Sequence, residues 1–537
     1  MDMQLVVFTS GLDFNVRCNV VRLAEQFPDA HITILVHAPV KRVGKLCSNQ
    51  LRNIRRHGWR WIPYQLGEIS GLLADKARRS PSRSTDRPGQ MFSHEALANH
   101  PRIAERRFAA INGVEACAFV RELGADLGIA LGAPILKEAL FALPRLGTIN
   151  LHKGRLPHYR GMPAAFWELQ RGEKSVGCSV HQVEAGLDTG AIIAEGSVPV
   201  DRFSTVGGVQ IKLHRLGVDL MCDAAAQVLA GTATFTPQAT GGTTNTRPTL
   251  GAAAALARKL EAGEPTESGA LKKLLKRAVF WGYGSVLMPA VNYWHGLTGQ
   301  QRVIILLYHR VSDEFRDNVT IGIERFDQHM AYIAKHYTLV SLRQIVQGDI
   351  PRGVSKPVLA VSFDDGYLDN FENAAPILMK HQVPCTFFIS TEKIRDNKPF
   401  DHDLRALGFG LDNMNWSQVQ TMHRWGFHFG SHTRNHVNLA EISDDLALQE
   451  LQGSLDDIRA HLGQEQVFIA FPYGRKHNIT DARVDMIKSM GYGACFSAYG
   501  GLNGLDMDPF NIRRIGVNWA FDLLALGART RGWDKTQ

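Results

Sequence analysis

The sequence predicts an α/β protein that folds as two separate domains. Three observations support this: the chain has 537 residues, short apolar strands alternate with helical stretches in both halves, and a polar stretch rich in glycine and threonine separates the halves. A chain of this length is too long for one hydrophobic core. Alternation of strands and helices predicts parallel sheets whose faces are covered by helices.

The first half predicts a doubly wound, Rossmann-like parallel sheet. Its expected elements are the strand Gln4–Thr9, the helix Asn15–Gln26, the strand His31–His37, the helix Val114–Leu123, and the strands Leu127–Leu131 and Thr148–His152. Sheets of this class bind ligands at the carboxyl ends of their strands. Asn150 and His152 stand at such an end and share one face, because strand side chains repeat every two residues.

The second half has the same alternation and predicts a barrel or a distorted (β/α) barrel. Its expected elements are the strands Val303–Leu307, Val358–Ser362 and Cys385–Ile389, and the helices Arg325–Lys335, Ala374–His381, Trp416–Trp425 and Leu446–Leu462.

Between the halves we expect a linker. Residues 240–249 are rich in Gly and Thr, residues 252–261 predict a helix, and residues 264–269 are polar. Such stretches mark boundaries, so we place the domains at 1–245 and 301–537 and the linker at 246–300.

The linker contains a basic stretch followed by an uncharged one. Residues 271–277 carry three lysines and an arginine, and residues 278–294 are uncharged but interrupted by two glycines and a proline. The uncharged run is marginal for a membrane span. Two interpretations remain open. Residues 271–294 lie on a membrane surface with Trp281 and Trp294 at headgroup depth, or they form a connecting helix packed on the second domain.

The composition is that of an ordinary globular protein, and the mild net charge is compatible with an anionic substrate without establishing one. Hydrophobic residues make up 45% of the chain and charged residues 21%, and the net charge is +8. That excess suits nucleotide sugars or polyprenyl phosphates. No basic stripe with interleaved aromatics predicts nucleic-acid binding. The basic run from Lys76 to Arg87 is best interpreted as a solvated loop.

Cysteine usage and the N-terminus indicate a cytoplasmic protein. The seven cysteines are scattered and form no Cys-x-x-Cys pair, which fits a reducing compartment. The chain begins with the apolar strand residues Leu5–Phe8 and shows no signal-peptide pattern. If the linker binds lipid, the protein would work at the inner face of the membrane.

Asn150, His152 and Asp188 are the candidate groups for acyl transfer to an amine. Such a reaction passes through a tetrahedral oxyanion and needs hydrogen-bond donors and a path for the amine proton. An amide and an imidazole supply the donors, and a carboxylate near the imidazole raises its pKa and relays a proton. On these residues alone, an ordinary pair that caps a strand end explains Asn150 and His152 equally well.

The surrounding segment, residues 147–161 (GTINLHKGRLPHYRG), followed by residues 176–181 (VGCSVH) and 186–190 (GLDTG), resembles the folate-dependent formyltransferases. The resemblance implies a formyltransferase fold, with Asn150, His152 and Asp188 as catalytic residues. It also implies 10-formyltetrahydrofolate as the donor. The loop residues that it assigns to donor binding are Leu156, Pro157, Arg160 and Gly161.

Two features of the chain depart from that family. The turn after the first strand, residues 9–15 (TSGLDFN), lacks the family's usual glycine- and serine-rich pattern. Members that act on tRNA carry a C-terminal barrel domain, and this chain has a different domain there. The difference argues against tRNA as the acceptor.

Asp365, His432 and His436 are candidate ligands of a divalent metal. Zinc suits imidazole and carboxylate ligands with one position left open for water, and such a site hydrolyses amides. The two histidines are four residues apart, so a helical turn or a tight loop can bring them together. Asp364 would stand beside the metal as general base. Taken without context, these four residues could equally be surface groups.

Four segments in order resemble the polysaccharide deacetylases, the NodB-like family-four carbohydrate esterases. They are residues 306–311 (LLYHRV), 362–370 (SFDDGYLDN), 430–436 (GSHTRNH) and 471–475 (FPYGR). The resemblance implies that Asp364 is the base, that Asp365, His432 and His436 bind zinc or another divalent metal, and that the backbone of Tyr473 helps to hold the oxyanion.

Two points of that second site stay open. His309 either lines the site or satisfies the end of the sheet. The family often has a late Leu-x-His as general acid, but the corresponding residues 511–518 (NIRRIGVN) contain no histidine. The general acid is therefore not assigned.

Together, the two resemblances predict a bifunctional enzyme that edits the N-acyl group of an amino sugar, in surface polysaccharide or glycolipid biosynthesis. One domain would hydrolyse an N-acyl group, most simply N-acetyl, and the other would formylate an amine. The sugar would be nucleotide-linked or lipid-linked. Three alternatives remain: the domains act on different molecules, the second domain is a deformylase, or one domain is a non-catalytic binding module.

Overall fold

The computed structural model describes residues 3–39, 87–261, 302–352 and 356–530, and these fall into two compact units. The first unit holds residues 3–39 and 91–261, and the second holds residues 87–90 and those from 302 onward. The predicted membrane-contact segment 271–294 and residues 76–86 of the predicted basic loop lie outside the described residues.

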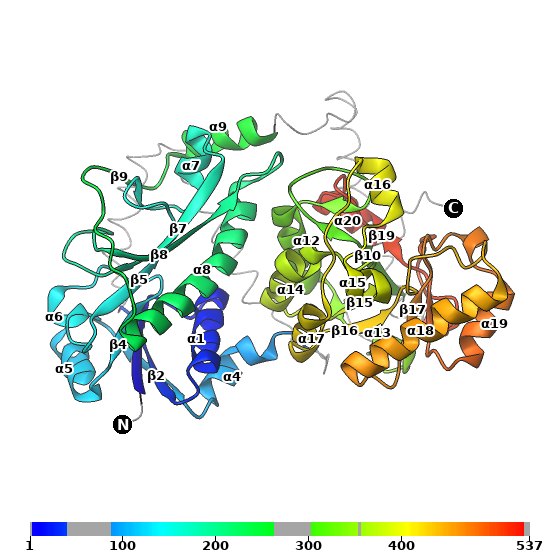
Figure 1. Cartoon of the computed structure of the whole chain (residues 1–537), viewed down its shortest axis with the longest axis horizontal. Helices are drawn as coiled ribbons and strands as arrows, with labels where there is room; N and C mark the ends of the chain where they lie inside the picture. The colour runs from blue at the N-terminus through cyan, green and yellow to red at the C-terminus, as the bar shows by residue number, and fades with distance from the viewer. Residues whose placement is uncertain (1–2, 40–86, 262–301, 353–355, 531–537) are drawn as a thin grey trace. The chain divides into compact units, whose positions relative to one another are not determined.

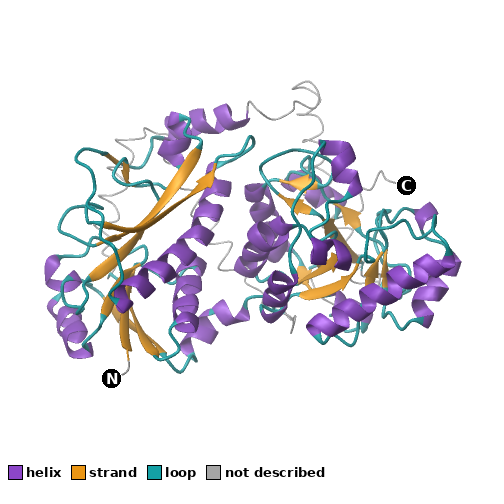
Figure 2. Ribbon diagram, in the orientation of Figure 1, coloured by secondary structure: helices purple, strands orange, loops and turns teal. Residues whose placement is uncertain are grey.

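The first unit is built on one sheet with the strand order β3-β2-β1-β4-β5-β7-β8 (Figures 1 and 2). Its strands are β1 (Met3–Thr9), β2 (Ala30–His37), β3 (Ile103–Phe108), β4 (Leu127–Ala130), β5 (Thr148–His152), β7 (Ser175–Gln182) and β8 (Ile192–Pro199). Its helices are α1 (Phe14–Gln26), α4 (His94–Ala98), α5 (Val114–Leu123), α6 (Glu138–Phe141), α7 (Phe166–Arg171), α8 (Val206–Ala230) and α9 (Leu250–Glu261). The predicted doubly wound sheet is confirmed for β1 to β5, which are parallel.

The edge formed by β7 and β8 is antiparallel, which the sequence pattern did not predict. β7 runs against β5 so that Asn150 faces His181 and His152 faces Ser179. The end of β7 therefore lies beside the start of β5, where the N–H of Val183 donates to the Thr148 carbonyl at 2.7 Å, and His181 is brought opposite Asn150.

The last part of the first unit folds back over its own loops. A short strand β9 (Thr243–Asn245) pairs in parallel with β6 (Tyr159–Gly161). Beyond it, α9 buries Leu256 in a cluster with Phe166, Leu169 and Leu213. Because α9 packs there, the first unit extends to residue 261 at least, past the boundary at 245 that we predicted.

The second unit is a curled parallel sheet with the order β18-β17-β16-β15-β14-β10-β19, and β13 adds to β14. Its strands are β10 (Val303–Tyr308), β13 (Thr338–Leu339), β14 (Val358–Phe363), β15 (Cys385–Ile389), β16 (His428–Ser431), β17 (Ile469–Ala470), β18 (Cys495–Phe496) and β19 (Ile515–Gly516), with a separate pair β11 (Arg310–Val311) and β12 (Thr320–Ile321). Its helices are α12 (Ile323–His336), α13 (Leu342–Val346), α14 (Ala375–His381), α15 (Thr391–Asp396), α16 (Asp401–Leu407), α17 (Trp416–Arg424), α18 (Asp444–Leu462), α19 (Asp481–Ser489) and α20 (Leu523–Arg529).

The predicted distorted barrel is confirmed, and its two ends approach each other. A bridge joins Phe496 at the end of β18 to Ile512, three residues before β19. The segment between Ile512 and β19 therefore lies at the seam of the curl, with β18 on one side and β10 on the other.

A row of aromatic rings sets the register of the strands that carry the second site. Tyr308, Phe363, Phe387 and Phe429 are successive partners across β10, β14, β15 and β16. Their ring centroids are 5.4, 5.1 and 5.7 Å apart and nearly parallel. Stacked pairs of this kind each stabilise a fold by about 0.5–1.5 kcal/mol. Because the rows are in register, the residues after β14 and β16 emerge at one edge.

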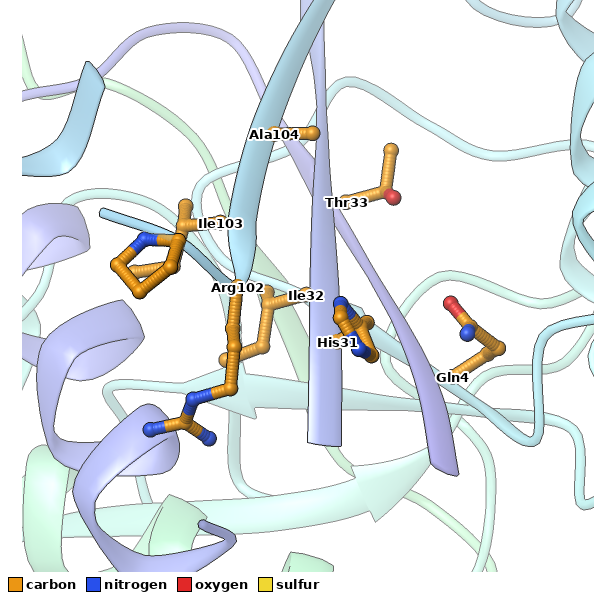
Figure 3. A pocket seen from close by; sticks show the side chains of 8 residues that line it. Gln4, His31, Ile32, Thr33, Arg102, Ile103 and Ala104 are labelled. Atoms are coloured by element: carbon orange, nitrogen blue, oxygen red, sulfur yellow. The ribbon is translucent and has the colours of Figure 1, made fainter. Parts of the chain in front are cut away.

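The first unit has a hollow of about 250 Å³ at the amino-terminal end of β1, β2 and β3 (Figure 3). It is lined by residues at and near the starts of three strands, among them Gln4 of β1, His31 of β2 and Ile103 of β3. Ligands of doubly wound sheets bind at the other, carboxyl end.

No described helix in either unit is both long enough and apolar enough to cross a membrane.

Candidate active sites

In the first unit, Asn150, His152, His181 and Asp188 converge at the carboxyl end of β5; we call these four residues the amide–imidazole cluster. The Nδ2 of Asn150 lies 3.0 Å from Nε2 of His181. His181 donates its Nδ1 proton to the Gln182 carbonyl at 2.8 Å, so in the neutral ring Nε2 accepts from Asn150. An Asn amide has two N–H donors, so a second one is left for another acceptor.

His152 is held in one orientation by the backbone. Its Nε2 donates to the Tyr159 carbonyl at 2.7 Å, which leaves Nδ1 facing Oδ2 of Asp188 at 3.5 Å. Burial lowers the pKa of His152, and the Asp188 charge opposes that shift only in part. The imidazole is therefore neutral near pH 7 and can accept a proton on the side of Asp188.

Asp188 is the centre of the cluster. Its backbone is left-handed (φ +53°), and its carboxylate accepts the N–H of Gly161 at 3.2 Å and lies 3.6 Å from Nε2 of His181. Burial alone would raise the pKa of Asp188, but the two neighbouring imidazoles, His181 and His152, and the N–H of Gly161 together lower it. The carboxylate therefore stays charged at the site.

The loop that resembles a donor-binding segment lies against this cluster. Leu156 and Pro157 are buried, and Gly161 supplies the N–H to Asp188. Arg160 donates through Nη2 to Gln238 at 2.9 Å, while its buried Nε has no partner within the described protein. A buried, unpartnered N–H is costly, so Arg160 is suited to a polar group of a bound ligand.

In the second unit, Asp365, His432 and His436 form a candidate metal site, with possible ligand atoms all within 4.8 Å of one another; we call these three residues the metal triad. Oδ1 of Asp365 lies 3.4 Å from Nε2 of His432 and 3.3 Å from Nε2 of His436. The histidines reach the site from a tight loop after β16 rather than from a helical turn; Thr433 and His436 both have positive φ.

The triad passes two tests of fit to a divalent cation. Oδ1 of Asp365 is buried without a hydrogen-bond partner, as an oxygen reserved for a metal would be. His432 donates its Nδ1 proton to the Ala470 carbonyl at 2.8 Å, which turns the Nε2 lone pair toward Asp365. The donor set, two imidazoles and one carboxylate, suits zinc and leaves a position open.

Asp364 stands beside the triad and is held by a residue that sequence reasoning missed. Arg514 donates to both of its carboxylate oxygens, at 2.6 and 2.7 Å. Oδ2 of Asp364 is 4.0 Å from Nε2 of His432. Burial would raise the pKa of Asp364, but the Arg514 and His432 charges lower it.

Two further imidazoles and one aromatic ring border the triad. Burial lowers the pKa of His309, and the charges of Asp365 and Asp364 oppose that shift; its buried Nδ1 has no hydrogen-bond partner. His402 of α16 donates to the Tyr367 hydroxyl at 2.8 Å and lies 3.9 Å from Asp365. The half-exposed Tyr473 ring lies 5.1 Å from that of His436.

Comparison with known proteins finds a match to one family in each unit, and we name the units the formyl transferase unit and the deacetylase unit after these matches. The formyl transferase family matches residues 73–225, and the polysaccharide deacetylase family matches residues 352–495. The chain joins a formyl transferase segment to a polysaccharide deacetylase segment. Both resemblances inferred from the sequence are thereby confirmed, and they indicate a transferase and an amide hydrolase.

Individual relatives cover only parts of the chain. The methionyl-tRNA formyltransferase of Ruegeria pomeroyi is 30% identical over 162 residues, which is 30% of this chain and 53% of that protein. The matched region spans between 33% and 53% of the length of these curated relatives.

Solved structures align with parts of the chain. The Streptococcus pyogenes deacetylase PplD in complex with acetate is 22% identical and covers 43% of this chain and 99% of its own, with a TM-score of 0.38. A sugar N-formyltransferase from a Shewanella species is 16% identical and covers 46% of this chain and 77% of its own, with a TM-score of 0.30.

All residues that the sequence singled out for chemistry lie in one of the two sites. The formyl transferase unit brings Asn150, His152 and Asp188 together, and the deacetylase unit brings Asp364 to the metal triad. Sequence reasoning missed the contributions of His181, His402 and Arg514. His181 ends the segment 176–181 that the formyltransferase resemblance already included, which was a usable signal; nothing in the local sequence marked the other two.

Proposed function

We propose that the chain is a bifunctional amino-sugar-modifying enzyme. The formyl transferase unit moves a formyl group from 10-formyltetrahydrofolate to a sugar amine, and the deacetylase unit hydrolyses an N-acyl group on a carbohydrate with a divalent metal. The observation that carries the proposal is that one chain holds both the amide–imidazole cluster and a metal triad with a positioned carboxylate base.

The amide–imidazole cluster supplies what formyl transfer requires. The acceptor nitrogen attacks the formyl carbon, an N–C bond forms, and the bond from that carbon to N10 of the folate breaks. The free N–H of Asn150 is placed to donate to the oxyanion. His152, neutral and next to Asp188, takes the proton that the amine loses and returns it to the folate nitrogen.

The donor would lie along the loop of Leu156, Pro157, Arg160 and Gly161. Support comes from the burial of Leu156 and Pro157, which offers apolar surface, and from the unpartnered Nε of Arg160. A binding site that combines apolar walls with a few directed polar groups is typical for a cofactor-sized ligand.

In the deacetylase unit, Asp365, His432 and His436 would hold zinc or another divalent ion, which when bound polarises the acyl oxygen and lowers the pKa of water. Asp364, fixed by Arg514, would remove a proton from a water molecule. The oxygen of that water would bond to the acyl carbon as the amide C–N bond breaks, which gives a carboxylic acid and, once its nitrogen is protonated, a free amine. The backbone N–H of Tyr473 is the proposed oxyanion donor, and His309 and His402 are the candidate acids for the leaving amine.

The proposed acceptor is an amino sugar carried on a nucleotide or a lipid. A deacetylase unit in the same chain supports a carbohydrate rather than a tRNA, because one unit would release the kind of amine that the other formylates. The net charge of +8 suits an anionic carrier. The most specific form of the proposal is an exchange of acetyl for formyl on one nitrogen.

We also propose that the enzyme works in the cytoplasm, at the inner face of the membrane when residues 271–294 bind lipid. Support comes from the cysteines within the described residues, which are all free. Sedimentation with anionic vesicles at low salt and release at high salt is the expected result; the same behaviour from a variant lacking the four basic residues of 271–277 would contradict it.

The test is mass spectrometry of N-acetylated and free-amine sugars, both nucleotide-linked and lipid-linked, incubated with the protein, zinc and 10-formyltetrahydrofolate. Replacement of acetyl by formyl on one molecule would establish the exchange. Formylation of free amines without loss of acetyl would assign the units to different substrates. Release of formate from a formylated sugar would make the deacetylase unit a deformylase.

No formyl transfer to any acceptor, together with intact hydrolysis, would leave the formyl transferase unit as a binding module and contradict the bifunctional proposal.

A further inference from the structure

A segment at the end of the formyl transferase unit crosses the loop of the proposed donor site; we call residues 232–246 the strap. It begins after α8, and its strand β9 can be followed in Figure 1. Thr236 exchanges two backbone hydrogen bonds with Ile192, and Met162 donates to the Asn245 carbonyl at 3.2 Å. Backbone hydrogen bonds therefore attach the strap to the rest of the unit near both of its ends.

Gln238, near the middle of the strap, joins the two loops that form the site. Its Nε2 donates to the carbonyl of Asp188 at 2.9 Å and to that of Gly190 at 2.7 Å. Its Oε1 accepts from Nη2 of Arg160 at 2.9 Å. One side-chain amide thus uses both donors and its acceptor to connect the Asp188 loop with the Arg160 loop.

The strap also holds the partner of the Asp188 carboxylate. Gly161, whose N–H donates to Asp188, pairs with Asn245 of the strap. A Cβ at Gly161 would lie 2.2 Å from the Asn245 carbonyl oxygen, so the two backbones approach as closely as glycine allows. The strap therefore holds both the carbonyl of Asp188 and Gly161, the residue that donates to the Asp188 carboxylate.

Arg160 receives its orientation from the same amide. With Nη2 engaged by Gln238, the guanidinium plane is fixed, and the buried Nε keeps an N–H that no described protein group accepts. A planar guanidinium held by one edge presents its other donors in a fixed direction.

We propose that Gln238 is a positioning residue for formyl transfer: through its side-chain amide it holds Asp188 beside His152 and aims Arg160 at the donor. This inference rests on the proposed formyl transfer. The side-chain hydrogen bonds of Gln238 go to Asp188, Gly190 and Arg160 and to neither His152 nor His181, so Gln238 acts through Asp188 and Arg160.

The test compares Gln238→Ala, Gln238→Glu and Thr243→Val in the full-length chain. Glu keeps an acceptor for Arg160 but loses both N–H donors to the Asp188 loop. Thr243→Val is the matched control, because it removes a different strap contact, the hydroxyl donation to the His158 carbonyl at 2.6 Å. Steady-state formyl transfer, thermal unfolding and hydrolysis by the other unit are measured for each variant.

We expect kcat to fall about tenfold to a hundredfold in both Gln238 variants, because a small misplacement of a catalytic group has effects of that size. The acid limb of the pH–rate profile should also move to lower pH, since the charge of Asp188 raises the pKa of His152 against the effect of burial. Thr243→Val should keep the wild-type kcat and profile.

A wild-type kcat in Gln238→Glu would overturn the inference. An equal loss of kcat in Thr243→Val would also overturn it, because any change in the strap would then have the same effect. If Gln238→Ala does not fold, as reported by thermal unfolding, Gln238→Glu decides the matter. Absence of formyl transfer by the wild-type chain would instead contradict the proposed function.

Discussion

Arg514 and Asp364 form a fully buried, two-pronged pair, with Nη1–Oδ1 at 2.6 Å and Nη2–Oδ2 at 2.7 Å. Arg514 lies just before β19, at the seam where the curled sheet of the deacetylase unit approaches closure. A bidentate pair fixes both the position and the plane of a carboxylate. The last strand of the unit thus orients the proposed base that follows β14.

Replacing Arg514 should remove hydrolysis and destabilise the deacetylase unit. In Arg514→Ala the buried Asp364 charge has lost its partner, which costs about 3–5 kcal/mol of unfolding free energy. We expect kcat for hydrolysis to fall about a hundredfold, because the base is no longer oriented. Urea unfolding and hydrolysis assays check both effects. The exposed neighbour supplies the control: Arg513→Ala should resemble the wild type in both measurements.

Glu450 of α18 should control metal affinity without touching the metal. Its buried carboxylate accepts the backbone N–H groups of Arg434 and Asn435 and the side chain of Asn435, which lie between the two triad histidines. Groups that support metal ligands change affinity by about 10–100-fold when removed.

We therefore expect weaker zinc binding in Glu450→Ala, measured by competition with a chromophoric chelator. Gln452→Ala on the same helix, which removes only a contact to Asp456, is the control. Equal affinity in the two variants would mean that the loop keeps its shape without Glu450.

The two chemistries should be separable by single changes. Asn150→Ala or His152→Ala should abolish formyl transfer and leave hydrolysis intact, because the groups of each site lie within one unit. Loss of both activities in either variant would show that the units depend on each other.

Metal removal should have the opposite selectivity. Dialysis against a chelator, or Asp365→Asn, should abolish hydrolysis and zinc retention and leave formyl transfer unchanged, since Asp365 supplies the buried carboxylate oxygen of the triad. Metal content and both activities are measured on the same samples. Undiminished hydrolysis by the metal-free protein would rule out the metal assignment.

The deacetylase unit should lose stability on mild acidification because of His329. This buried ring accepts from the Tyr308 hydroxyl through Nδ1 and donates to the Phe521 carbonyl through Nε2, so its neutral form is fully satisfied. Burial lowers the pKa of His329 to about 4.

Between that value and the ordinary value near 6.5, the unfolded chain binds a proton that the folded unit does not, so stability falls as pH falls. The expected loss from His329 between pH 7 and pH 5 is about 2 kcal/mol. Urea unfolding at the two pH values should show a smaller difference in His329→Gln, which does not titrate. An unchanged difference would assign the loss to other groups.

The local sequence pattern determined where several strands and helices of this protein lie. The strands Thr148–His152 and Cys385–Ile389 and the helix Val114–Leu123 lie where the sequence predicts them, because apolar periodicity and chain punctuation act over a few residues. The same is true of Asn150 and His152, whose common side follows from strand geometry, and of the two adjacent acids that follow β14.

Tertiary structure decided which distant groups meet those residues. Arg514 reaches Asp364 across 150 positions only because the sheet curls, and Gln238 reaches Asp188 only because the strap returns over the loop. The antiparallel pairing of β7 with β5 likewise brings His181 opposite Asn150. The sequence specifies which side chains occur and how they are spaced along the chain. The partner of a buried charge or amide depends instead on how distant segments pack against one another in the fold.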